Sequence, residues 1–518
     1  MELSDHVVVS GADGRLVGRS TRDVAALLDS ALTRPRVVVH LHGGLVDEAA
    51  GKRLAASLVP VYSGADAFPV FLVWQAGIRE VLRNNVLEIA REELFERLLG
   101  RVLGWAVGRV RGEEEGVRGA GSVLLPSQPE LVAELGGRRR LTDPEAGAEP
   151  FAGQPLPERD PGADGEPYAL PPEDEAEFLR QVTADAELQR QVAAAAADRG
   201  LAWGEADGTR GAPTVEPVPS RIDDDVLAEI AAGEEEGARG LVSAAVLARK
   251  ALQVLRAVLL RYRTQTDSGV YTTVVEEVLR AFYLGSVGGA LWQAMKKETE
   301  DTFSADHTDR AGRLLLDRLA ARRLDDEGPR LTLVGHSTGA VFIDNLLTAA
   351  AGTRPAEAAG GSSSGEFQVC FLAPACTTQH FGQTLDVADD LIGRFRMFTM
   401  TDEAERADRL VGAVYPRSLL YLVSGLLERD RGASAVAPVL GMSRYLAAGG
   451  LDRLLGSDDA VTARLARVRR YTTEADRLVL SPSPADAPAD ARSSACSHPD
   501  FDEDPLVRAS LVRLIESW

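Results

Sequence analysis

The feature that most constrains this chain is a strand–turn–helix pattern at residues 331–345, which read LTLVGHSTGAVFIDN. The apolar, β-favouring run LTLV meets the turn GHSTG, and an apolar helical pattern follows directly. Gly335 and Gly339 are required because a Cβ at either position would collide with the neighbouring strand or helix. The sequence therefore predicts a sharp turn that holds Ser337 in a strained conformation, exposes its hydroxyl above a sheet and aims a helix N-terminus at it.

The five-residue pattern occurs twice, so the pattern alone does not decide the matter. Residues 361–365 read GSSSG and place Ser363 in the same pattern, within the Gly/Ser/Ala-rich stretch 351–366. No strand pattern precedes this copy and no amphipathic helix follows it, which is typical of a flexible loop. The flanking strand and helix therefore favour Ser337 over Ser363.

Composition and charge narrow the classes of partner. The chain has 518 residues, enough for a large core and an additional domain or lid. Its net charge of −21 argues against binding to nucleic acid and against strong attraction to anionic membranes. No apolar run is long enough to cross a bilayer, and no secretory signal is visible. Cys370, Cys376 and Cys496 have neither a disulfide-framework nor a metal-ligand spacing, so we expect a reducing, cytoplasmic location.

The chain divides into two α/β regions around a different middle. Residues 1–77 and 324–518 alternate β-favouring runs with helical patterns, the rhythm of a parallel sheet. Residues 78–323 interrupt this core, and within them residues 111–240 are acidic and rich in Pro and Gly. We expect residues 111–240 to be largely loop or disordered, interrupted by short helices. An insertion here would act as a cap or lid over the carboxyl ends of the strands, where open α/β sheets bind ligands.

A serine nucleophile needs oxyanion donors, and a second turn provides candidates. Residues 40–45, HLHGGL, close a β-branched strand pattern and make the turn after it. A His-Gly-Gly turn presents free backbone N–H groups opposite the nucleophile. We assign the oxyanion hole to the N–H of Thr338 with that of Gly44, or of Leu45 if the turn is one residue longer. The alternative is an ordinary Gly-rich turn between strand and helix.

The catalytic base is sought among seven histidines. The chain order of serine, acid and histidine puts the base after the last strand and before the C-terminal helix. His498, in SHPDFDEDP, lies in that loop, whereas the other candidate, His380, follows the strand before the expected acid. We interpret Asp500, Asp502 and Asp504 as loop and helix N-terminal charges rather than catalytic groups.

The orienting acid is expected at the end of the penultimate strand. The strand pattern RFRMFTM runs directly into Thr401-Asp402-Glu403, so Asp402 is the expected acid. Glu403 and Asp408 are neighbours that could take its place. Alternatively, Asp402 only caps the helix that starts near residue 404.

In order and context, these elements resemble the lipase- and esterase-like members of the α/β-hydrolase superfamily. The resemblance covers roughly residues 1–77 and 324–518. It implies a mostly parallel sheet of about eight strands with helices on both faces and a large helical, partly disordered cap. It also implies acyl transfer to Ser337 followed by hydrolysis, with His498 as base and Asp402 holding the imidazole. Neither a metal nor an organic cofactor is implied.

The substrate is less constrained than the chemistry. The apolar helix at residues 415–427, with amphipathic helices at 78–110 and 241–262, could line an apolar acyl pocket or could simply pack in the core. We expect a carboxylic ester, lipid esters included, while a thioester or amide stays open. Two other interpretations remain: a non-catalytic binding or scaffold protein with this fold, and an acyltransferase or peptidase that uses the same triad.

Overall fold

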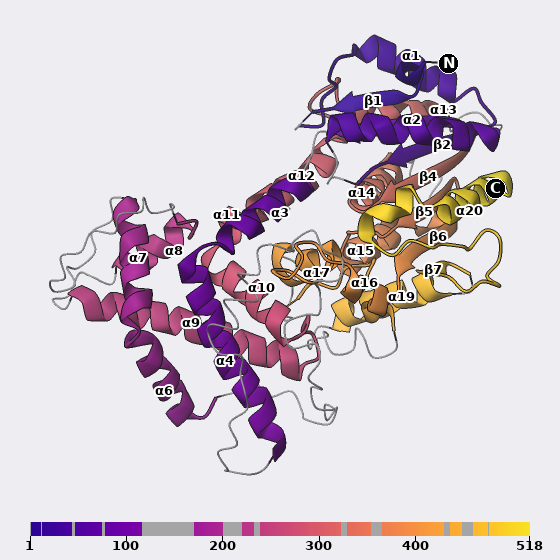
Figure 1. Cartoon of the computed structure of the whole chain (residues 1–518). Coiled ribbons are helices and arrows are strands. Elements are labelled where there is room, and N and C mark those ends of the chain that lie inside the picture. The colour runs from indigo at the N-terminus through magenta and orange to yellow at the C-terminus, as the bar shows by residue number, and fades with distance from the viewer. Residues whose placement is uncertain are drawn as a thin grey trace.

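A computed structural model shows an α/β protein with one seven-stranded sheet, in which each strand runs parallel to its neighbours (Figure 1). The structure describes residues 2–11, 13–43, 47–74, 78–115, 170–199, 220–232, 239–322, 329–353, 365–428, 436–447, 459–474 and 476–518. The strands are β1 (Val7–Ser10), β2 (Arg36–Leu41), β3 (Phe68–Trp74), β4 (Arg330–His336), β5 (Phe367–Leu372), β6 (Ile392–Met400) and β7 (Leu478–Ser481), in the spatial order β1-β3-β2-β4-β5-β6-β7. The prediction of an α/β fold is confirmed, with seven strands in the described residues where about eight were expected.

Helices surround the sheet and also form a separate bundle. Those in the first half of the chain are α1 (Thr21–Ala31), α2 (Glu48–Gly64), α3 (Ile78–Ile89), α4 (Glu93–Glu115), α6 (Pro172–Thr183), α7 (Ala186–Asp198), α8 (Asp224–Ala232) and α9 (Arg239–Arg263). The others are α10 (Val270–Phe282), α11 (Leu284–Val287), α12 (Gly289–Asp301), α13 (Ala311–Arg322), α14 (Gly339–Gly352), α15 (Thr378–Ala388), α16 (Asp402–Ala407), α17 (Leu419–Leu422), α18 (Ser443–Leu446), α19 (Asp459–Thr473) and α20 (Pro505–Glu516). Short helical turns are η1 (Leu3–Asp5), η3 (Asp389–Leu391), the π-helical η4 (Val423–Leu427) and η5 (His498–Asp502).

The strand sequences explain the position of the turn that contains Ser337. β2 and β4 read RVVVHL and RLTLVGH, and both are buried along nearly their whole length. Such β-branched, continuously apolar runs are typical of parallel strands covered on both faces. In the register of these strands Val39 lies opposite Leu333, and β4 pairs with β5 on its other side. The carboxyl end of β4 therefore emerges in the middle of the sheet.

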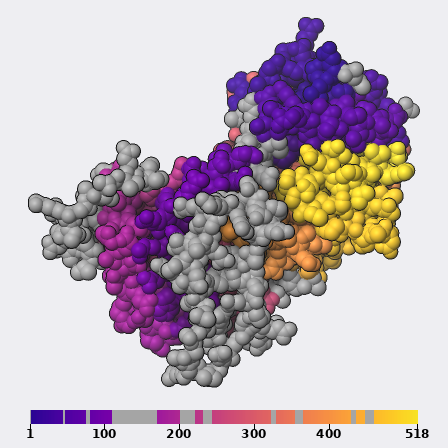
Figure 2. Space-filling view, viewed as in Figure 1, coloured from indigo at the N-terminus to yellow at the C-terminus, as the bar shows by residue number. Residues whose placement is uncertain are grey.

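Two apolar clusters cover the two faces of the sheet. On one face, side chains of α1, α13, α14 and α15 pack on alternate strand residues such as Val39 and Leu333. On the other face, α2 and α20 pack on residues such as Val38 and Val334. Figure 2 shows the N-terminal and C-terminal segments adjoining at the surface, as the contact between α2 and α20 requires. Although α13 falls inside the predicted insertion at 78–323, it packs on the sheet.

A third apolar cluster forms a helical body beside the sheet (Figure 1). It contains side chains from α3, α4 and α6 to α12, and the C-terminal half of the chain contributes α17 and η4. The apolar segment at residues 415–427 is buried in this cluster, where η4 contacts α10. Of the two alternatives for this segment, the structure therefore shows core packing. Much of the stretch 111–240 lies outside the described residues.

Within the described ranges, no helix combines the length and the apolar character that crossing a membrane requires.

Candidate active site

Ser337 lies between the end of β4 and the start of α14, in the predicted turn. Its backbone has φ 54°, in the left-handed region that side chains with a Cβ rarely adopt. The residue is held there by neighbouring backbone: its N–H donates to Leu372 O at 2.8 Å, and its carbonyl accepts from Ala375 N at 2.9 Å. A left-handed conformation costs roughly 1–2 kcal/mol in a non-glycine residue. Strain of this kind is characteristic of functional sites, and the predicted strained turn is present. The predicted exposure of the Ser337 hydroxyl is wrong, because the strands and helices around the turn bury the residue completely.

The two glycines of the turn are sterically required. A Cβ on Gly335 would lie 2.7 Å from Ile343 Cδ1 in α14, and a Cβ on Gly339 would lie 2.2 Å from Leu41 O in β2. The predicted collisions with helix and strand are confirmed. Gly43 is also tightly placed, since a Cβ there would lie 3.1 Å from Ser337 Cβ. The helix and strands around Ser337 therefore pack so closely that residues larger than glycine would not fit at these positions.

His498 lies beside the same cavity as Ser337. It begins η5, between β7 and α20, where chain order placed the base. A cavity of about 700 Å³ is lined by Ser337, His498 and side chains from α2, α3, η5 and α20. The other candidate base, His380, lies in the first turn of α15 and does not line this cavity. Ser337 and His498 thus line one cavity, and His380 does not.

The lining of this cavity combines charged and apolar side chains. The charged ones include Asp47 at the start of α2, Arg53 of α2, Glu80 of α3, Glu503, and Arg508 of α20, and the apolar ones are Ala50, Leu54 and Pro499. The Arg508 guanidinium donates through Nε to Asp502 O at 2.7 Å and through Nη2 to Ser57 Oγ at 3.1 Å, which ties α20 to α2. An aliphatic chain would gain little from such surroundings, because burying charged groups against it costs their hydration.

Asp402 and Asp408 have different surroundings. Asp402 begins α16, where its carboxylate accepts from Tyr421 Oη at 2.7 Å, and it does not line the Ser337 cavity. The N-cap of that helix is Thr401, so the capping alternative does not describe Asp402. Asp408, six positions on, accepts a hydrogen bond from the backbone N–H of His498 at 2.9 Å. Of the acids considered from the sequence, Asp408 is the one hydrogen-bonded to the His498 residue.

A buried carboxyl follows between these two aspartates. Glu405 is fully buried, and its carboxylate accepts from the hydroxyl of Ser418. Burial raises the pKa of Glu405 to about 8, with the nearby Asp408 and Asp402 charges adding to the shift. Glu405 is therefore mostly protonated at neutral pH.

Of the three residues assigned to the oxyanion hole, the structure describes Thr338. Thr338 is the N-cap residue of α14, so its backbone lies at the positive end of that helix. Gly44 and Leu45 lie outside the described residues. The start of their turn is well defined: the His42 ring donates through Nδ1 to Gly43 O at 2.7 Å and accepts through Nε2 from Trp74 N at 3.2 Å. Burial lowers the pKa of His42 to about 4, so it is neutral and fixed in one tautomer.

Sequence reasoning missed a buried cluster beneath Ser337. The ring of His336 hydrogen-bonds through Nδ1 to Asp502 Oδ2 at 2.6 Å, and His40 Nε2 lies 3.5 Å from Asp502 Oδ1. Burial by itself raises the pKa of Asp502, but the adjacent His336 and His40 outweigh it and hold that pKa well below its usual range. The interpretation of Asp502 as a loop charge is therefore incomplete, since it is 6% exposed and paired. In contrast, Asp504 does cap α20, and Asp500 caps η5, as expected.

Comparison of the chain with protein-family models, curated proteins and solved structures finds no match. Function must therefore be argued from this geometry.

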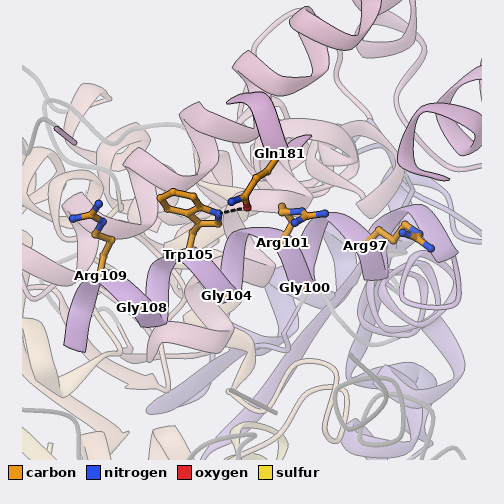
Figure 3. Close-up of a pocket in the computed structure, with 8 residues that line it drawn as sticks. All are labelled: Arg97, Gly100, Arg101, Gly104, Trp105, Gly108, Arg109 and Gln181. Atoms are coloured by element: carbon orange, nitrogen blue, oxygen red, sulfur yellow. Dashed lines mark hydrogen bonds between the residues drawn. The ribbon is translucent and has the colours of Figure 1, made fainter. Parts of the chain in front are cut away.

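A second hollow lies on the helical body rather than on the sheet (Figure 3). It has a volume of about 520 Å³ and follows Gly100, Gly104 and Gly108 along α4. Each of its arginines has an acidic partner: Arg97 and Arg101 share Asp185, at 3.3 and 2.7 Å, and Arg109 pairs with Asp174. Trp105 Nε1 donates to Gln181 at 3.1 Å. These pairs join α4 to α6 and α7, and they explain the arginine row structurally.

Among the described residues, no cluster of His, Cys, Asp and Glu side chains has the composition of a metal site.

Proposed function

We propose that this protein is a serine hydrolase that cleaves a carboxylic ester through an acyl-enzyme intermediate on Ser337. The observation that carries the proposal is the strained Ser337 at the strand–helix turn, on the wall of a cavity that His498 also lines. A serine at a helix N-terminus, in a cavity that a histidine also lines, supports nucleophilic catalysis, which pairs such a hydroxyl with a base.

In this proposal His498 takes the proton of Ser337 Oγ as the oxygen attacks the ester carbonyl. The tetrahedral oxyanion is stabilised by the N–H of Thr338 at the start of α14, together with a donor from Gly44 or Leu45. His498 then protonates the leaving alkoxide, and water releases the acid by the reverse sequence. Asp408 is the proposed acid, since its carboxylate accepts from the backbone N–H of His498 and so places a negative charge at that residue, whereas Asp402 bonds to Tyr421.

The cavity favours an ester with short or polar substituents over a long acyl chain. Asp47, Arg53, Glu80 and Glu503 line it, and the apolar segment at residues 415–427 is buried elsewhere. A lipid ester would place methylene groups against these charges without any gain from apolar burial. The cysteines support a reducing, cytoplasmic setting for this activity, since Cys370, Cys376 and Cys496 are all free.

The decisive test of the nucleophile is labelling by a fluorophosphonate probe. Wild-type protein should be labelled at a one-to-one ratio and Ser337→Ala not at all. Labelling that persists in Ser337→Ala would refute the assignment. Absence of labelling in folded wild-type protein would favour a non-catalytic binding protein with this fold.

A matched pair of variants separates the two candidate acids. Asp408→Asn keeps an oxygen that can accept the His498 N–H but removes the negative charge, so it should slow labelling by roughly 10²–10⁴-fold, the usual range for losing one member of an acid–base pair. Asp402→Asn, which removes a charge of the same size from the other end of α16, should leave the rate close to wild type. The reverse order would restore Asp402 as the acid.

Substrate preference is tested with p-nitrophenyl esters of increasing chain length. Activity should be greatest with acetate and should decline toward the dodecanoate. Added acceptor alcohols and amines distinguish hydrolysis from acyl transfer, because the two reactions give different products.

A further inference from the structure

The ring of His336 makes two hydrogen bonds, and both partners are acceptors. Nδ1 lies 2.6 Å from Asp502 Oδ2, and Nε2 lies 3.0 Å from the backbone carbonyl oxygen of His498. A carbonyl oxygen cannot donate, so Nε2 carries a proton. A neutral imidazole has a single N–H, and therefore the short bond to Asp502 requires a second proton, shared between Nδ1 and the carboxylate.

The surroundings suit a pair that holds this extra proton. His336 and Asp502 are both buried, so an imidazolium there needs the compensating carboxylate, and the carboxylate needs the cation. The titratable groups facing the pair are His40 in β2, His42 just after β2, His498 of η5 and Arg508 of α20. Tyr62 of α2 completes this shell by hydrogen-bonding His40 at 2.9 Å.

His498 is held from both sides of its backbone. Asp408, after β6, accepts from the His498 N–H at 2.9 Å, and His336, at the end of β4, donates to the His498 carbonyl at 3.0 Å. The His336 and His498 rings also lie against each other, with centroids 5.2 Å apart. Because His336 is the residue before Ser337, its hydrogen bond to the His498 carbonyl fixes the position of His498 relative to Ser337.

We propose that protonated His336, paired with Asp502, is a positioning residue that holds His498 over Ser337 and that releases it when the shared proton is lost at high pH. The proposal rests on the proposed function and adds a regulation to it. After deprotonation the ring retains one N–H, so either the Asp502 bond or the His498 carbonyl bond is lost. Activity should then fall on the alkaline side, in addition to the acid-side loss that protonation of His498 causes.

The primary experiment measures the pH dependence of fluorophosphonate labelling. Wild-type protein should give a bell-shaped profile. His336→Gln keeps an amide N–H donor but cannot titrate, so it should label up to about 100-fold more slowly, as expected for a misplaced base, and should lose the alkaline fall. Asp502→Asn removes the compensating charge, so its alkaline fall should begin at lower pH than in wild type. If His336 had only a structural role, these variants would be less stable and would label more slowly, but the alkaline fall of the labelling rate would stay at the same pH.

A second readout does not depend on activity. In protein labelled with ¹⁵N-histidine, NMR should show both ring nitrogens of His336 carrying protons at neutral pH, with that signal absent from His336→Gln. A neutral ring for His336 overturns the proposal even if labelling succeeds, and so does a wild-type labelling rate that stays level at high pH. A doubly protonated His336 in protein that is never labelled would instead refute the serine hydrolase function and leave the protonated pair standing.

Discussion

Removing the hydroxyl of Ser337 should make this protein more stable. Ser337 is completely buried, and its Oγ has no hydrogen-bond partner among the described residues. Its backbone is also held at φ 54°. Both features cost folding free energy, and the proposed catalytic role of Ser337 would account for them, since active sites commonly trade stability for activity.

The size of the effect follows from these two features. A buried polar group without a partner costs about 1–3 kcal/mol, so Ser337→Ala should gain an amount of that order. Ser337→Gly additionally relieves about 1–2 kcal/mol of left-handed strain. It loses about 0.4–1 kcal/mol through the greater freedom of glycine in the unfolded chain. The glycine variant should therefore be at least as stable as the alanine variant, the reverse of the usual order inside a helix or strand.

Thermal unfolding of the three proteins measures the effect. One kcal/mol corresponds to roughly 2–4 °C for a cooperative unit of 150–250 residues, so Ser337→Ala should raise Tm by at least about 2 °C. Ser510→Ala is the matched control, because that buried serine accepts from Arg492 N at 2.9 Å and donates to Arg492 O at 3.0 Å. The control should lower Tm. A Tm for Ser337→Ala equal to or below wild type, with the control behaving as expected, would refute the reasoning.

Three further experiments test other parts of the structure. Gly339→Ala places a methyl group 2.2 Å from the Leu41 carbonyl oxygen, so it should abolish labelling and lower Tm, which parallel labelling and calorimetry would check. Glu405 has a folded pKa of about 8, raised by burial, so the native state holds its proton and loses stability as pH rises from about 4.5 to about 8. Relative to wild type, the free energy of unfolding of Glu405→Gln should therefore rise by about 1.4 kcal/mol per pH unit across that window. If Tm plotted against pH runs parallel for the two proteins between pH 5.5 and 7.5, this prediction is contradicted. Arg261→Met strands the buried carboxylate of Glu276, now 2.5 Å from the guanidinium, and should cost about 3–5 kcal/mol, while Glu276→Gln in the same chain should recover part of the lost Tm.

Local patterns were sufficient for much of the site. The run LTLV, the two glycines and the start of the next helix are neighbours in the sequence. The structure has the strand, the tight turn and the helix at the positions that this local pattern predicts. The place of His498 followed from the order of strands along the chain. The candidate acid did not follow in this way. Asp402 and Asp408 lie at opposite ends of the short helix α16, and which of them contacts His498 depends on how that helix packs against its neighbours.

The pairing of His336 with Asp502 had no signal in the sequence. The two residues are 166 positions apart, and Asp502 stands among other acids that really are helix caps. The apolar run at residues 415–427 was equally ambiguous, because hydrophobicity says that a segment is buried but not against what. Packing against α10 decided that question.

The sequence by itself determined the turn at Ser337, the parallel α/β rhythm and the order of the candidate residues, because those features depend on backbone sterics and on periodicity over short distances. Only the tertiary structure decided that Asp408 contacts His498, that His336 contacts it from the other side, and that charged side chains line the cavity beside Ser337. Those outcomes depend on side chains from separate strands and helices meeting at the carboxyl edge of one sheet, and no local pattern encodes such a meeting.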